Sequence, residues 1–133
     1  MVFQYTYAGS DKIPTGEILN VASTGLDFRT PKTIGSQIGS PIPGGQYDHN
    51  YVLNGSYGSL ILAASAYDPQ TGRMMECYTD QPGMQFYNST DRTTFCFETQ
   101  HFPDSPNWPH FPSTELRPVG KFESTTIYKF SSE

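Results

Sequence analysis

Glu98 and the proline-rich segment that follows it are the residues of this chain best suited, by type and spacing, to do chemistry. Glu98 ends a short aromatic run, Phe95-Cys-Phe97, which favours a strand. A carboxylate held at the end of a strand can accept a proton from a bound hydroxyl group or return one to it. Residues 99–113 contain four prolines and several aromatic side chains, so they predict a rigid, aromatic-lined loop beside the carboxylate.

Asp48 and Gln85 are two further polar residues within predicted strands. Asp48 lies in the stretch YDHNY at residues 47–51, and Gln85 lies in the stretch QPGMQFY at residues 81–87. A carboxylate accepts hydrogen bonds and an amide both donates and accepts them, so both residues could hold a ligand's hydroxyl groups. Each has a structural alternative as well. Asp48 could close a local turn, Gln85 could bond a neighbouring backbone, and Glu98 could be a solvated residue at the rim of a sheet.

Composition excludes several classes of function. The net charge is −5 and only 16% of residues are charged, with no basic patch, so nucleic-acid binding is not expected. No segment approaches the roughly 20 apolar residues of a membrane span, so we expect no membrane association of that kind. No spacing of histidine and cysteine is typical of a zinc site, and we expect neither a metal nor a cofactor.

The predicted fold class is all-β. Aromatic residues make up 14% of the chain, and eleven prolines and twelve glycines favour strands and turns over helices. Residues 34–46 are rich in glycine, proline and serine and predict a loop. The expected strands are residues 18–21, 26–29, 47–53, 60–67, 73–79, 84–87, 95–98 and 122–130.

The cysteines and the N-terminal residues predict a cytoplasmic protein. Residues 1–12 lack the basic and apolar regions of a secretion signal. Cys77 and Cys96 both lie in predicted strands and could be neighbours across a sheet. Two cysteines are too few for a disulfide scaffold, so we expect reduced, buried thiols.

Three segments resemble motifs of one enzyme family, the aldose 1-epimerases or galactose mutarotases. They are YDHNY at 47–51, QPGMQFY at 81–87 and FCFETQH at 95–101. The stretch ETQHFPDSPN, at residues 98–107, is long and specific. The resemblance extends from about residue 13 to residue 130, because framework segments resemble the family as well. These segments are residues 14–18, 26–29, 67–69, 72–73 and 126–130.

The resemblance implies a reaction and a role for each of the three polar residues. Aldose 1-epimerases interconvert the α and β anomers of free hexoses such as galactose and glucose. Glu98 matches the family's general base, and Asp48 and Gln85 match positions that hydrogen-bond the sugar. The implied fold is the large antiparallel β-sandwich of the mutarotases, of which this chain would supply a part.

The chain also departs from the family's pattern. The family's general-acid histidine, an asparagine-arginine pair and a second sugar-binding histidine lie in an N-terminal region that has no match here. We therefore interpret residues 1–133 as a single partial domain, the C-terminal portion of an aldose 1-epimerase domain. Such a portion would expose sheet edges and could pair with an N-terminal half or with another copy. Glu98 without an acid partner should catalyse poorly.

Two other functions fit the same residues. The chain could be a non-catalytic carbohydrate-binding or structural β-domain derived from the mutarotase fold. It could instead be a glycosidase that uses Asp48 and Glu98 as its pair of carboxylates. His49, His101 and His110 are each conceivable proton donors, although the first two match framework positions and the third lies in the proline-rich loop.

Overall fold

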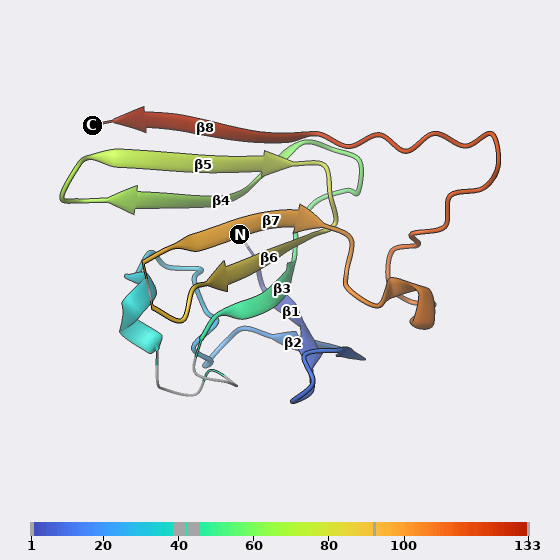
Figure 1. Ribbon diagram of the computed structural model, residues 1–133, viewed down its shortest axis with the longest axis horizontal. Coiled ribbons are helices and arrows are strands. Elements are labelled where there is room, and N and C mark those ends of the chain that lie inside the picture. Colours follow the sequence, from blue (N-terminus) through green and yellow to red (C-terminus); the bar gives the residue numbers. More distant parts are fainter. Residues whose placement is uncertain (1, 39–41, 43–45, 92, 133) are drawn as a thin grey trace.

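Two antiparallel β-sheets form the computed structural model, which describes residues 2–38, 42, 46–91 and 93–132 (Figure 1). Sheet A has the strand order β2-β1-β3-β6-β7, and sheet B has the order β4-β5-β8. No α-helix occurs among the described residues, and therefore none that could span a membrane. The strands are β1 (Gln4–Ala8), β2 (Pro14–Asn20), β3 (Asp48–Val52), β4 (Ile61–Asp68), β5 (Arg73–Thr79), β6 (Gly83–Asn88), β7 (Phe95–Gln100) and β8 (Thr126–Ser132).

The all-β prediction is confirmed, and most expected strands are present. Two expectations were wrong in detail. Residues 26–29 form a turn, because the Asp27 carboxylate accepts hydrogen bonds from the backbone N–H and the guanidinium of Arg29. Residues 122–125 precede β8 without joining it, and β1 was not predicted. The expected loop at 34–46 contains a short 3-10 helix, Ile34–Gln37, and residues 39–41 and 43–45 lie outside the described residues.

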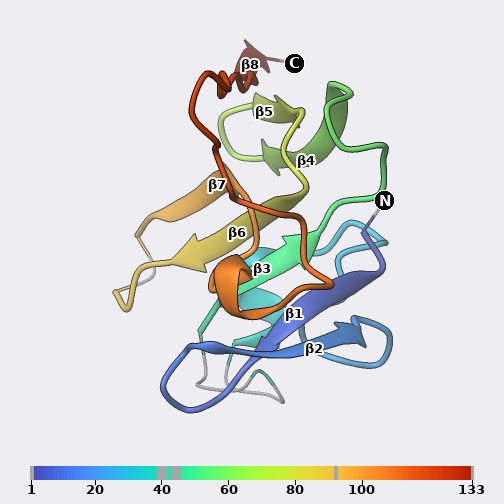
Figure 2. The same ribbon diagram turned by 90° about the vertical axis from the view of Figure 1, so that its right-hand side faces the viewer.

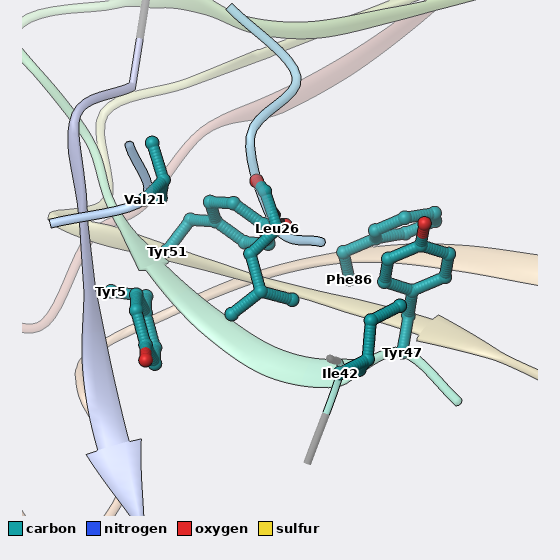
Figure 3. Close-up of a cluster of buried hydrophobic side chains, with 7 residues drawn as sticks. All are labelled: Tyr5, Val21, Leu26, Ile42, Tyr47, Tyr51 and Phe86. Carbon is teal, nitrogen blue, oxygen red and sulfur yellow. Dashed lines mark hydrogen bonds between the residues drawn. The ribbon is translucent and has the colours of Figure 1, made fainter. Parts of the chain in front are cut away.

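One face of sheet A carries an aromatic core (Figure 3). The rings of Tyr47 and Phe86 stack at 4.7 Å between centroids, and Phe28 packs edge-on against both. Tyr51 donates a hydrogen bond from its hydroxyl to the carbonyl of Leu26 at 3.0 Å, which satisfies the phenol inside the core. Burial of these side chains fixes which face of the sheet points inward. The cluster comprises Tyr5, Val21, Leu26, Ile42, Tyr47, Tyr51 and Phe86.

A second apolar cluster lies between the two sheets. Leu53, Cys77 and Met84 are buried there, with Phe97 packed against them. Strand β8 is also tied to sheet A, because the Tyr128 hydroxyl donates to the carbonyl of Phe97 at 2.6 Å. The two sheets are therefore held together by apolar packing and by a hydrogen bond to the edge of β7.

The two cysteines lie in different sheets. Cys77 is fully buried in β5 of sheet B, whereas Cys96 is exposed in β7 of sheet A. The expectation that they could be neighbours across one sheet, both buried, was wrong. Cys96 faces outward because it alternates with Phe95 and Phe97, whose rings pack against the aromatic core.

The segment after β7 covers part of the other face of sheet A. Figure 2 shows this segment, with its short 3-10 helix η2 (Ser105–Asn107), in front of the strands of sheet A. Phe102 lies against Gly83 of β6, and the ring of Trp108 lies against Gly16 of β2. His110 Nε2 is 2.8 Å from the carbonyl oxygen of Gly16. The proline-rich loop is therefore anchored on the sheet by aromatic rings that lie over glycines.

Gly83 provides a test of this anchoring. A Cβ atom at residue 83 would lie 2.7 Å from Asn50 Oδ1 and 2.9 Å from the ring of Phe102, so Gly83→Ala requires both contacts to shift. We expect a loss of about 1–3 kcal/mol in the free energy of unfolding, measured in urea. Gly35→Ala is the matched control, because a Cβ there meets nothing within 4 Å. Equal stability of the two variants would contradict the close approach of Phe102.

Candidate functional site

Strand register brings Asp48, Gln85 and Glu98 onto one face of sheet A. Gln85 of β6 pairs directly with Glu98 of β7 on one side and with Asn50 of β3 on the other. Directly opposed residues in a sheet point to the same face, as do residues two apart in one strand, so Asp48 shares this face through Asn50. This is the face opposite the aromatic core, and we call it the polar face.

Asp48 is held by two donors. Gln85 Nε2 donates to Asp48 Oδ1 at 2.9 Å, and Lys12 Nζ donates to Asp48 Oδ2 at 2.6 Å. Partial burial raises the pKa of the Asp48 carboxyl, but the hydrogen bonds from Lys12 and Gln85 outweigh it and hold that pKa below its ordinary value. Asp48 is therefore ionised at neutral pH and can accept hydrogen bonds from a ligand, but it is a poor proton donor.

A second row of amides orients Gln85. Gln100 Nε2 donates to Asn50 Oδ1 at 3.2 Å and approaches Gln85 Oε1 at 3.5 Å. Asn50 is buried and donates in turn to the hydroxyl of Thr6 at 3.4 Å. These contacts favour one orientation of the Gln85 amide, with its nitrogen toward Asp48.

Sequence reasoning did not single out Asn50, Gln100 or Lys12 as parts of the site. The first two each lie two residues along a strand from a predicted site residue, Asp48 or Glu98, so strict alternation would have found them. Lys12 lies 36 residues from Asp48, in the turn between β1 and β2, and only the fold brings the two together.

Glu98 differs from Asp48 in being exposed, and among the described residues no side chain is hydrogen-bonded to its carboxylate. Its neighbours along β7 on the polar face are Cys96 and Gln100. A carboxylate in this position keeps its acceptor sites free for a ligand laid across the sheet.

The three histidines are engaged elsewhere. His49 alternates with Asp48, so its ring points to the core face, where it packs edge-on against Tyr5 and burial lowers its pKa. His101 follows β7 and lies 2.9 Å from Gln81 Oε1 and 3.1 Å from the Tyr57 hydroxyl. His110 contacts β2 through Gly16. None of these contacts places an imidazole beside Glu98.

The register also bears on the glycosidase alternative. Asp48 and Glu98 are two strands and two residues apart, which corresponds to roughly 12 Å between their Cα atoms at ordinary sheet spacings. A retaining glycosidase holds its two carboxyl groups about 5–5.5 Å apart, with one sugar bond between them. The bonds of Asp48 to Lys12 and Gln85 oppose such an approach, which disfavours a retaining glycosidase.

Of the three predicted residues on the polar face, Glu98 is exposed, whereas Asp48 and Gln85 are half-buried. A pocket of about 190 Å³ lies toward one end of the sheet and is lined by residues that include Val52, Tyr57, Gln81 and Phe102 but none of those three. Within the described residues there is no cluster of three or more histidine, cysteine, aspartate or glutamate side chains that could hold a metal.

Comparison with known proteins agrees with the architecture. The family described as Aldose 1-epimerase matches residues 3–129 of the chain. This chain belongs to the aldose 1-epimerase family. Among curated relatives of this family member, galactose mutarotase from Bos taurus is 40% identical in an alignment of 134 positions that covers 90% of this chain and 39% of the relative. Galactose mutarotase from Homo sapiens is 38% identical, over 95% of this chain and 41% of its own length.

More distant similarity extends to bacteria and to a solved structure. Aldose 1-epimerase from Escherichia coli is 28% identical over 98% of this chain and 43% of its own length. A crystal structure of a GalM/aldose epimerase homologue from C. elegans superposes with a TM-score of 0.85 at 22% identity, over 98% of this chain and 44% of that one. The mutarotase-type fold is therefore confirmed. This aldose 1-epimerase family chain spans about two-fifths of the length of the curated relatives it matches.

The bond between Lys12 and Asp48 predicts a pH effect in this family member. A depressed carboxyl pKa contributes stability that is present above the ordinary aspartate pKa, about 3.9, and is lost as pH falls through the lower, folded-state pKa. In Lys12→Met the pKa of Asp48 should rise toward its ordinary value, as measured by carboxyl NMR titration. The stability difference from the parent chain should be larger at pH 7 than at pH 2.

Lys121→Met is the control, because that ammonium pairs with Glu123 in the exposed segment before β8. It should leave the Asp48 titration unchanged. An Asp48 pKa that is the same in Lys12→Met and in the parent chain would contradict the ion pair.

Proposed function

We propose that this chain carries the base-bearing part of a hexose mutarotation site, which interconverts the α and β anomers of galactose or glucose. The observation that carries the proposal is the direct pairing of Gln85 with Glu98, with Asp48 bonded to Gln85 on the same face. Family membership supports it, because residues 3–129 match the aldose 1-epimerases. Since the chain covers only part of its relatives' length, activity and substrate are part of the proposal.

The chemistry assigns each residue a role. Glu98 takes the proton of the anomeric hydroxyl as the bond between C1 and the ring oxygen breaks, and a second group protonates that oxygen. After rotation about the C1–C2 bond, the hydroxyl formed from the ring oxygen attacks C1 and gives its proton back to the second group. Glu98 returns its proton to the oxygen on C1, which completes the other anomer. Asp48 and Gln85 bind other hydroxyl groups and fix the sugar so that the anomeric hydroxyl faces Glu98.

Among the described residues, the polar face offers no histidine or protonated carboxyl group to protonate the ring oxygen. Asp48 has a lowered pKa and is ionised, and the three histidines are engaged elsewhere. We therefore infer that this chain corresponds to the C-terminal portion of a mutarotase domain. Its acid would come from an N-terminal half or, in self-association, from another copy.

A second function is favoured by the same observation. Asp48, Gln85 and Glu98 can hold a sugar by hydrogen bonds without opening its ring, so the chain could act as a non-catalytic carbohydrate-binding or structural domain. The cytoplasm is the compartment we propose for either function. Both cysteines are unpaired, and the exposed thiol of Cys96 suits a reducing environment.

Substitution of Glu98 tests its role. In a chimera that joins the N-terminal part of bovine galactose mutarotase to this chain, Glu98→Gln should lower kcat for galactose by about 10²-fold or more, because the base is lost. Glu115→Gln, at an exposed carboxylate paired with Arg117, is the control and should retain full turnover. Near-native turnover of the Glu98 variant would remove Glu98 from the mechanism.

The chain alone should be a poor catalyst. Polarimetry on freshly dissolved α-galactose should show anomer exchange barely faster than in buffer, because among the described residues no histidine lies beside Glu98 to protonate the ring oxygen. Addition of the relative's N-terminal part as a separate chain should accelerate the exchange. Rapid exchange by the chain alone, abolished by Glu98→Gln, would mean that a resident group such as His101 supplies the proton.

A further inference from the structure

Lys12 occupies an unusual backbone position at the edge of the polar face. It lies in the turn between β1 and β2, where its own N–H donates to the carbonyl of Gly9 at 3.0 Å. The next residue, Ile13, donates its N–H to Asp11 Oδ1 at 3.1 Å. Lys12 has a φ of 63°, in the left-handed region that glycine and asparagine occupy far more readily than lysine.

The ion pair with Asp48 is by itself a weak reason for a lysine at this position. The left-handed backbone is unfavourable for a side chain with a Cβ atom. The ion pair with Asp48 offers little in return, because the Lys12 side chain is 65% exposed and surface pairs are screened by solvent. A strained backbone conformation that holds a charged group beside candidate binding residues is a pattern typical of functional sites.

The Lys12 ammonium supplies hydrogen-bond donors beside the carboxylates of the polar face, and a sugar needs both donors and acceptors. Asp48 and Glu98 are carboxylates and only accept hydrogen bonds, whereas a sugar hydroxyl both donates and accepts. Lys12 uses one N–H on Asp48 Oδ2 and has two more to offer. A donor and an acceptor side by side match two neighbouring hydroxyl groups of a pyranose, one donating to Asp48 and the other accepting from Lys12.

We propose that Lys12 is a further sugar-contacting residue, which together with Asp48 binds two adjacent hydroxyl groups of an uncharged hexose. This inference rests on the proposed function and assigns it one more binding residue. Lys12 contributes to affinity and not to proton transfer. In an active chimera its loss should therefore raise KM and leave kcat nearly unchanged.

The experiment measures galactose binding to the 133-residue chain by ligand-observed NMR. We expect the parent chain to bind, Lys12→Met to bind at least fivefold more weakly, and Lys12→Arg to recover part of the loss because it retains N–H donors. Lys121→Met should bind like the parent chain. Backbone amide spectra of each variant establish that it is folded.

A series of monodeoxygalactoses separates direct contact from a structural effect. In the parent chain, removal of the hydroxyl that meets Lys12 should weaken binding, whereas Lys12→Met should bind that deoxy sugar and galactose equally well. If Lys12 only oriented the Asp48 carboxylate, the order of affinities for the deoxy sugars would be the same in the parent chain and in Lys12→Met. That result would contradict a direct contact between Lys12 and the sugar.

Two further outcomes are distinguishable. If the parent chain binds galactose, Asp48→Ala abolishes binding and Lys12→Met has no effect, the proposed site stands and Lys12 is excluded from it. If the parent chain binds no hexose, alone or with the N-terminal part of a relative, the proposed function fails and the role of Lys12 fails with it.

Discussion

The pairing register of β3, β6 and β7 is the constraint on which the rest of this structure depends. Alternation along these strands sends aromatic rings to one face and amides and carboxylates to the other. A slip of one residue in β7 would move Glu98 into the core and Phe97 into solvent, so burial of the rings fixes the register strongly. The hydrophobic core thereby positions the polar face without touching it.

Sequence patterns predicted most of the strands but missed β1 and assigned a strand to residues 26–29, where none forms. β1 was missed although Tyr5 and Tyr7 alternate with the polar residues Gln4 and Thr6. In the fold this strand is buried on both faces, with Tyr5 in the core and Thr6 beneath Asn50. The turn at 26–29 was predicted as a strand because its apolar residues alternate, yet the carboxylate of Asp27 captures Arg29 instead. Local hydrogen bonds of this kind compete with strand pairing and leave little trace in hydrophobicity.

For the site, resemblance gave the identity of Glu98, Asp48 and Gln85, and the fold added their arrangement. The pairing of Gln85 with Glu98 requires knowledge that β6 and β7 form a hairpin in one particular register. The approach of Lys12 to Asp48 requires more, since a turn between β1 and β2 must reach across to β3. Contacts between distant segments depend on the whole sheet order, which no single stretch of sequence specifies.

The hydrogen bond from Tyr128 to the carbonyl of Phe97 also covers part of the outer edge of sheet A. β7 is the outermost strand of sheet A, and an unprotected outer strand invites another chain to add to it. Tyr128 covers part of that edge through its bond to Phe97, and the hydroxyl of Thr126 covers another part through its contact with the hydroxyl of Thr99. Strand β8 thus shields the outer edge of β7, the strand that carries Glu98. Loss of Thr126 and Tyr128 would leave the outer edge of β7 uncovered and available for pairing with another strand, apart from any loss of packing in sheet B.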